Sequence, residues 1–136
     1  MRVEIDKKDL QGKVDELLHK IGERIAEVAR EEIVKKNAIA TGLLLKSIKV
    51  VKRSWKEYEV GSDCPYAPFV EYGTEPHRPP FEAIYNWVRV KIGGTEEEAR
   101  KIAWKIVKKI EKEGTDPKPF LIPAVMEVFT ENVRHS

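Results

Sequence analysis

The sequence has very little cysteine and no long apolar run. Cys64 is the only cysteine among 136 residues, which excludes an internal disulfide and a cysteine metal cage. No apolar stretch approaches the roughly 20 residues that a membrane span requires. The first ten residues, MRVEIDKKDL, lack the apolar segment of a signal peptide. We therefore expect a protein with no membrane partner, made in the cytoplasm and used there or inside a larger particle.

The chain also lacks an excess of charge of one sign. Charged residues make up 35% of the sequence, yet the formal net charge is only +2. This balance favours solubility and ion pairs over a strong electrostatic field. Nucleic-acid binders are usually more basic, so we expect no sequence-specific nucleic-acid partner. Amide side chains are scarce beside abundant lysine and glutamate, which is typical of proteins from thermophiles.

The first third of the chain has the periodicity of an amphipathic helix. Apolar residues recur at steps of three and four and share one face. They are Leu10, Val14, Leu17, Leu18, Ile21, Ile25, Val28, Ala29 and Ile33. We predict a helix over about Lys7–Lys36, which is about 45 Å long at a rise of 1.5 Å per residue. Its apolar face requires a sheet or a partner chain as cover.

The next segment has the alternation of a β-hairpin. Apolar and charged residues alternate around Val50 and again around Val60. This pattern predicts strands at about 47–54 and 56–62. A lone hairpin is only marginally stable in water, so we expect the long helix to cover it.

A pair of helices is predicted over residues 81–113. The first ends at Gly93-Gly94, and Thr95 with Glu98 forms a capping box that opens the second. Two antiparallel helices joined by this glycine turn are the expected arrangement. The second helix is expected to stop at Gly114.

Short elements flank this helical pair. Pro68 is expected to begin a short helix that Gly73 ends. Residues 120–122 are expected to be extended, and Pro123 to open a last helix. The predicted fold class is α+β, in a single domain over residues 1–136. A long N-terminal helix packs on a small antiparallel sheet, with the helical hairpin to one side and a C-terminal helix closing the core.

One short pattern occurs twice. Gly73-Thr74-Glu75-Pro76 and Gly114-Thr115-Asp116-Pro117 each follow a helical stretch and precede a phenylalanine. Glycine permits a left-handed exit from the helix, and proline blocks its continuation. We interpret the two copies as similar stop-and-turn devices, which are too few for a repeat architecture.

Few residues favour catalysis or metal binding. Asp63, Glu71 and His77 are the best candidates for acid–base work, and they support the hypothesis of a hydrolase. His19 has glutamates at helical spacing, but a solvated helix face is favoured over a metal site. Cys64 has no basic neighbour in sequence that would lower its pKa. No phosphate-binding glycine loop or nucleophile elbow is present, so we expect no cofactor and no enzymatic activity.

A lysine-rich stretch is another candidate binding site. The lysines share one side of the predicted helix 95–113, next to Trp104. They are Lys101, Lys105, Lys108, Lys109 and Lys112. Contact with nucleic acid is one hypothesis for this side. A solvated face, partly paired with Glu111 and Glu113, is favoured over it.

Aromatic residues gather around the proline-rich loops. They are Tyr66, Phe69, Tyr72, Phe81 and Phe120. Aromatic side chains of this kind fill cores and also form protein–protein contacts. The sequence leaves both roles open for each of them.

Three segments resemble a family of tailed-phage proteins. The segments are TGLLLKSI at 41–48, YAPFVEYGT at 66–74 and PFLIPA at 119–124. In this order they resemble the gene-product-ten family of tail components of tailed phages and proviruses, over about residues 7–130. The central segment is the most specific. The helical pair at 81–113 is interpreted as an insertion, and Lys118 stands where the family usually has arginine.

The resemblance implies a non-catalytic head–tail connector, neck, tail-completion or other tail component. Such a protein forms rings and docks onto other neck, tail or portal-associated proteins. It is located in the virion, or in the host cytoplasm during assembly. The motif residues are then expected in the core or at an interface. They are Thr41, Gly42, Ser47, Tyr66, Ala67, Pro68, Phe69, Val70, Glu71, Tyr72, Gly73, Thr74, Pro119, Phe120, Pro123 and Ala124. We also expect the second and third segments to lie close together.

Overall fold

The first helix, α1, spans Lys7–Lys36, as the apolar periodicity predicts. The computed structural model describes residues 1–38 and 40–134, with side chains described as far as Glu131. Asp6 caps the helix by accepting a hydrogen bond from the Lys8 backbone N–H at 2.8 Å. Asn37 ends it in the left-handed conformation, with φ 49°. The buried residues of α1 lie between Gly22 and Ile33, so the N-terminal third of the helix is the less covered part.

A two-stranded antiparallel sheet packs on α1. The short helix α2 (Thr41–Lys46) leads into β1 (Ile48–Ser54), and β2 (Glu57–Ser62) returns beside it. Val50 pairs with Val60 in the register. Both valines face Gly22 of α1, where a β-carbon would lie 3.0 Å from Val50 Cγ1. The glycine therefore lets the helix approach the sheet closely. Both strands were predicted, and each begins one residue later than expected.

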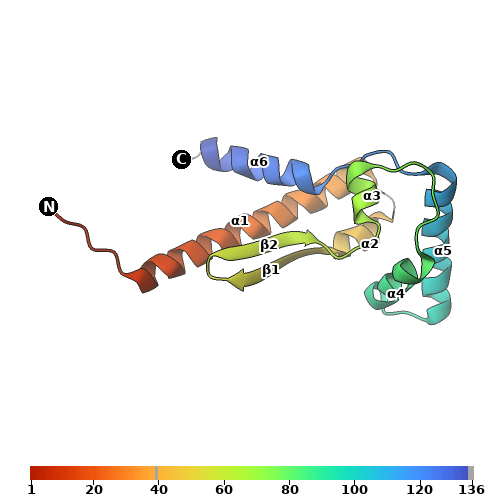
Figure 1. The fold of residues 1–136 in the computed structure, drawn as a ribbon, viewed down its shortest axis with the longest axis horizontal. Coiled ribbons are helices and arrows are strands. Elements are labelled where there is room, and N and C mark those ends of the chain that lie inside the picture. The colour runs from red at the N-terminus through yellow and green to blue at the C-terminus, as the bar shows by residue number, and fades with distance from the viewer. Residues whose placement is uncertain (39, 135–136) are drawn as a thin grey trace.

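A helical unit occupies one end of the molecule (Figure 1). It consists of α3 (Ala67–Tyr72), α4 (Phe81–Ile92) and α5 (Glu96–Glu113). The Thr95 hydroxyl caps α5 by accepting from the Glu98 backbone N–H at 3.1 Å, which confirms the predicted cap. The Phe81 and Trp104 rings stack at 4.3 Å and join α4 to α5. These two helices form the predicted antiparallel hairpin.

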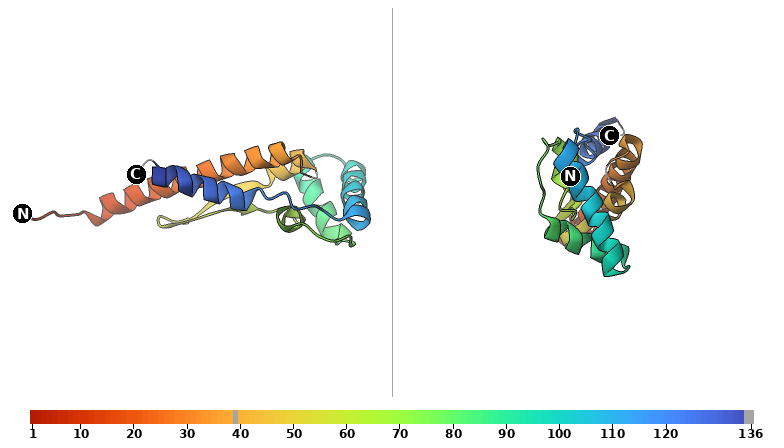
Figure 2. Two further views of the ribbon diagram at one scale, coloured as in Figure 1. Left: turned by 90° about the horizontal axis from the view of Figure 1, so that it is seen from above. Right: turned by 90° about the vertical axis from the view of Figure 1, so that its right-hand side faces the viewer.

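The last helix, α6 (Leu121–Arg134), runs back along α1 in the opposite direction (Figures 1 and 2). Lys36 Nζ donates to the Pro119 carbonyl at 2.6 Å near one end. Arg24 forms an ion pair with Glu131 at 2.7 Å near the other. The antiparallel pairing buries Ala124 and Val128. The predicted α+β architecture is therefore confirmed.

The start of α6 corrects one prediction. Residues 120–122 were expected to be extended, with Pro123 opening the helix. The helix in fact begins at Leu121. Proline is tolerated in the first turn of a helix, where backbone N–H groups have no partner within the helix. The earlier start also has a distant cause, because Glu71 binds the first N–H groups of α6.

Candidate functional site

The second motif segment binds the linker that leads into the third, and the two segments lie close together, as predicted from the sequence. The Lys118 backbone N–H donates to the Val70 carbonyl at 2.8 Å. The Thr115 hydroxyl donates to the Phe69 carbonyl at 2.6 Å. Backbone groups that α3 leaves unpaired thus find partners in the 115–118 linker. The contact fixes the linker that leads into α6.

Glu71 holds the two segments together through its carboxylate. Its two oxygens accept hydrogen bonds from the backbone N–H groups of Phe120 at 3.1 Å and Leu121 at 2.9 Å. Glu71 is buried, with 8% of its surface exposed. The first N–H groups of a helix need such partners, and the positive end of the helix dipole favours a carboxylate. Glu71 therefore caps α6 from about 50 residues away in sequence.

The repeated glycine–threonine pattern forms one joint. Thr74 and Thr115 exchange two backbone hydrogen bonds, each 2.9 Å long. Gly73 and Gly114 both have positive φ angles, 76° and 67°. A β-carbon at Gly114 would lie 2.4 Å from the Thr74 carbonyl oxygen. The two turns, expected only to be similar devices, bind one another and close the base of the α4–α5 hairpin.

The first motif segment links α1, α2 and the sheet. The Thr41 hydroxyl donates to the Ala38 carbonyl at 2.5 Å. Ser47 is buried and donates to the Leu44 carbonyl at 2.5 Å. It also accepts from the Ser62 hydroxyl at 2.7 Å, which joins the end of α2 to the end of β2. Polar motif residues here satisfy backbone and hydroxyl groups within the fold.

The sixteen motif residues divide into covered and exposed positions. The buried ones are Ser47, Tyr66, Ala67, Val70, Glu71, Phe120 and Ala124. The half-buried ones are Thr41, Phe69, Gly73, Thr74, Pro119 and Pro123. The exposed ones are Gly42, Pro68 and Tyr72. Most of the motif therefore serves packing, and only a few members are available for contact with another protein.

An exposed apolar surface lies where α3 meets α6. Pro68, Tyr72 and Ile122 help to line a hollow of about 230 Å³. Two further exposed apolar side chains, Met126 and Phe129, follow Ile122 along α6. We call these five residues the α3–α6 surface. Ile122, Met126 and Phe129 are spaced at steps of four and three residues, which places these three on one side of α6. The sequence did not reveal this side, because residues 120–122 were expected to be extended, which left Ile122 outside the last helix.

Asp63, the first candidate for acid–base work, is engaged in ion pairs. Its carboxylate lies 2.7 Å from Lys49 Nζ and 2.9 Å from Lys91 Nζ, and it accepts from the Trp87 indole at 3.1 Å. Burial raises the pKa of Asp63, but the hydrogen bonds from Lys49, Lys91 and Trp87 outweigh it and lower the pKa to about 2. The group therefore stays ionised and joins β1 to α4.

His77 and Glu71, the other two candidates, have separate partners. His77 Nδ1 lies 3.2 Å from the Thr74 hydroxyl, and its ring packs edge-on against Phe69 at 4.8 Å. Glu71 is occupied by α6. The described part of the chain contains no cluster of histidine, cysteine and carboxylate groups that would hold a metal ion. His19 packs against the Tyr58 ring at 5.9 Å. His77, Glu71 and His19 therefore each make separate contacts within the fold.

Cys64 lies buried between β2 and α3. Burial raises the pKa of its thiol to about 12. The thiolate is the reactive form of cysteine, so this side chain is protonated and poorly nucleophilic near neutral pH. The Cys64 thiol is therefore a poor candidate for a catalytic nucleophile.

The lysine-rich side of α5 surrounds Trp104 and is open to solvent. Lys101, Lys105 and Lys108 are exposed around the indole. Lys101 lies 3.8 Å from Glu97, an exposed i,i+4 pair. Arg78 lies over the Trp104 ring at 5.8 Å. The exposed lysines fit the predicted solvated face, but the ion pair described on this side is to Glu97 and not to the expected Glu111 or Glu113.

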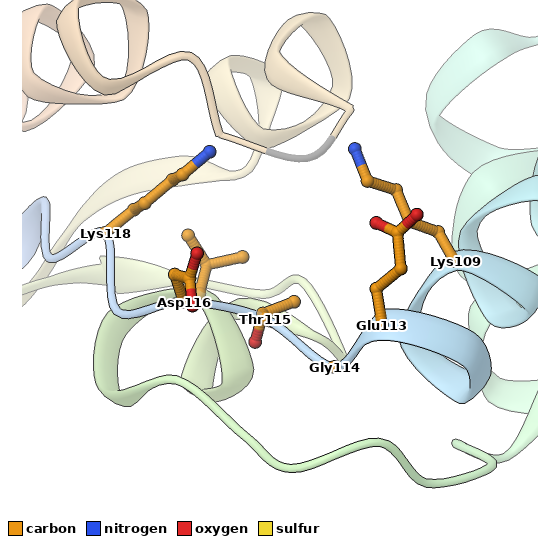
Figure 3. A pocket seen from close by; sticks show the side chains of 7 residues that line it. Lys109, Glu113, Gly114, Thr115, Asp116 and Lys118 are labelled. Carbon is orange, nitrogen blue, oxygen red and sulfur yellow. The ribbon is translucent and has the colours of Figure 1, made fainter.

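A small polar hollow lies between the end of α5 and the 114–118 linker (Figure 3). Two basic side chains, Lys109 and Lys118, and two acidic ones, Glu113 and Asp116, help to line it. Lys118 Nζ donates to the Asn37 carbonyl at 3.2 Å. The hollow has balanced charge and one of its cations is already bound to backbone, so its geometry assigns it no chemistry.

The comparison with known proteins identifies one family. Residues 3–73 match the family model described as "Bacteriophage HK97-gp10, putative tail-component". The match includes the first motif segment and nearly all of the second, and it ends before the third. No curated protein and no solved structure matches the chain. None of the described helices is long and apolar enough to cross a membrane. The matched residues make up just over half of the sequence, and the chain therefore belongs to the HK97 gp10-like family of bacteriophage tail components.

Proposed function

We propose that the protein is a non-catalytic structural component of the tail or neck of a tailed phage or provirus. It forms a ring of identical subunits and docks onto neighbouring connector or portal-associated proteins in the virion. No cofactor takes part. The family membership supports the structural role, and the surface of the molecule supports assembly.

The observation that carries the proposal is the α3–α6 surface. Monomeric soluble proteins rarely expose large contiguous apolar patches without a partner. Tyr72, Ile122 and Phe129 are each at least half exposed. The two exposed large motif side chains, Pro68 and Tyr72, lie in this same surface. Most motif residues are covered, but these two are exposed on the surface where we expect a partner to bind.

The proposed absence of catalysis rests on the partners of the two candidate carboxylates. The Asp63 carboxylate neutralises two lysines, and the Glu71 carboxylate caps α6. A general base must be free to reach the proton that it abstracts. Both carboxylates already have partners within the fold.

Sedimentation velocity over a wide concentration range tests the proposal. We expect a monomer or small oligomer whose average size grows with concentration, because each contact alone must offset the entropy of association. Electron microscopy of the largest species is expected to show closed rings. Addition of purified portal-bearing heads is expected to promote assembly at lower concentration, because binding sites held close together raise the effective concentration. A tight dimer that does not change with concentration contradicts the proposal.

A further inference from the structure

α6 is apolar on two opposite sides. Its inner side buries Ala124 and Val128 against the core. Its outer side carries Ile122, Met126 and Phe129, which are 50%, 62% and 59% exposed. A helix that is amphipathic in a monomer needs only one apolar side. The outer side is therefore available to an occupant from outside the subunit.

The N-terminal arm, residues 1–6, is a second unpartnered apolar element. Met1, Val3 and Ile5 alternate with charged residues, the period of an extended strand. All three are more than 70% exposed. The arm has no regular secondary structure and points away from the rest of the molecule (Figure 1). No described part of its own subunit covers these side chains.

The two elements match in length and spacing. From Ile122 to Phe129 the helix rises about 10 Å. From Met1 to Ile5 an extended arm spans about 13 Å. Side chains two residues apart on a strand are separated by about 7 Å, and the outer side chains of α6 are about 4.5 to 6 Å apart along the helix. Three apolar arm side chains can therefore lie along the three apolar side chains of α6.

The arm cannot reach the outer side of its own α6. The Arg24–Glu131 ion pair places the far end of α6 beside Arg24 of α1. Lys7 lies 17 residues before Arg24, which is about 25 Å of helix. Six extended residues span about 20 Å at most. Ile122 lies still farther along, toward the Lys36–Pro119 contact. The arm that covers this surface must belong to another subunit.

We propose that the arm of one subunit lies along the α3–α6 surface of the next copy of this chain. This inference rests on the self-assembly proposed above and names the contact that drives it. The arm and the α3–α6 surface are different patches, so the contact is head-to-tail, and such contacts close into rings when the rotation permits. The exposed end of the second motif segment, at Pro68 and Tyr72, then becomes part of the contact.

Exposed-residue variants test this contact without unfolding the subunit. Val3→Asp removes the apolar character of the arm, and Met126→Asp does the same for α6. The matched controls are Glu4→Gln in the arm and Glu127→Gln on α6. Circular dichroism checks the fold of each variant. Sedimentation velocity is expected to show that each Asp variant needs at least about tenfold higher concentration to assemble, because a buried valine or methionine side chain is worth that factor in affinity. The controls are expected to assemble like the wild type.

Mixing the two variants separates this contact from others. Val3→Asp retains an intact α6, and Met126→Asp retains an intact arm. A one-to-one mixture is expected to form dimers through one contact and no larger species. If the wild type assembles but Val3→Asp assembles equally well, the arm contact is wrong and the ring proposal stands. If only Val3→Asp is impaired, the arm binds elsewhere, such as the free edge of the hairpin, and the inference is wrong. If the wild type stays monomeric at all concentrations, both proposals are contradicted.

Discussion

Glu71 is the residue on which the contact between the two motif segments depends. Its carboxylate pairs two backbone N–H groups at the start of α6. Glu71→Ala leaves these groups buried without a partner, and we expect a loss of about 2–3 kcal/mol in the free energy of unfolding. Urea denaturation of both proteins measures this difference. Glu75→Ala, a change at an exposed residue in the loop that follows α3, is the control and is expected to alter stability by less than about 0.5 kcal/mol. Equal effects of the two changes contradict the capping role.

Asp63 gives the stability a pH dependence of known sign. The folded-state pKa of about 2 lies below the value of about 3.9 for an unfolded aspartate. The folded state therefore favours the ionised carboxylate of Asp63. The resulting gain in the free energy of unfolding is present above about pH 4 and is lost as the pH falls toward 2. Because Asp63 is partly exposed, we expect Asp63→Asn to cost only about 1 kcal/mol at neutral pH.

Thermal or urea unfolding at several pH values checks this expectation. The stability difference between the wild type and Asp63→Asn is expected to shrink between about pH 4 and pH 2. Asp116→Asn, a change at an exposed aspartate of the linker, serves as the control. A difference that stays constant over this range shows that the ion pairs to Lys49 and Lys91 do not cause it.

At the scale of elements, Gly114 in the joint and Gly12 in the exposed part of α1 are expected to respond to substitution in opposite ways. Gly114 has φ 67°, and a β-carbon there meets the Thr74 carbonyl oxygen at 2.4 Å. We expect Gly114→Ala to cost at least about 2 kcal/mol through backbone strain and this clash. Gly12 lies in the exposed part of α1, and a β-carbon there meets nothing within 4 Å. We expect Gly12→Ala to stabilise the protein by about 0.5–1 kcal/mol through helix propensity. Denaturant unfolding of both variants measures the contrast, and a loss in Gly12→Ala contradicts the assignment.

Local signals decide which elements the sequence reveals. The bounds of α1 follow from apolar spacing and from the cap Asp6, which binds the N–H of Lys8 two residues further on. The start of α5 follows from Thr95 and Glu98, which are neighbours in sequence. The start of α6 does not, because its cap comes from Glu71. The sequence shows which segments form helices, but it does not show which distant side chain binds their ends.

Pairing between elements is also outside local sequence patterns. The repeated Gly-Thr-acid-Pro pattern was recognised, yet nothing in it indicates that Thr74 and Thr115 bond to each other. The three acid–base candidates are close in sequence, but the fold gives each of them different partners. Nearness in sequence suggested a cluster of acid–base residues that the fold does not form, and distance in sequence concealed the pairing of Thr74 with Thr115. Both outcomes depend on the path of the chain through α4 and α5.

At the scale of the whole molecule, the arrangement of charge argues against strong nucleic-acid binding. The net charge is +2. The lysines of α5 are the densest basic group, and Glu97 pairs with one of them. Affinity for nucleic acid comes chiefly from release of counterions by unpaired cations. We therefore expect weak binding or none at ~150 mM salt, where charges farther apart than about 8 Å are screened.

Fluorescence anisotropy with a labelled duplex and a labelled single strand measures this binding at several salt concentrations. The comparison variant is Lys101→Glu with Lys105→Glu, which reverses two exposed charges beside Trp104. Because the wild-type affinity is expected to be weak, the variant is expected to differ little from it at physiological salt. Submicromolar binding that falls steeply with salt and is lost in the variant contradicts this expectation. That result assigns the α5 face to nucleic acid, since only unpaired cations facing phosphate produce such a slope. Assembly through the arm and the α3–α6 surface uses apolar contacts on other elements, so it is expected to persist in the same variant.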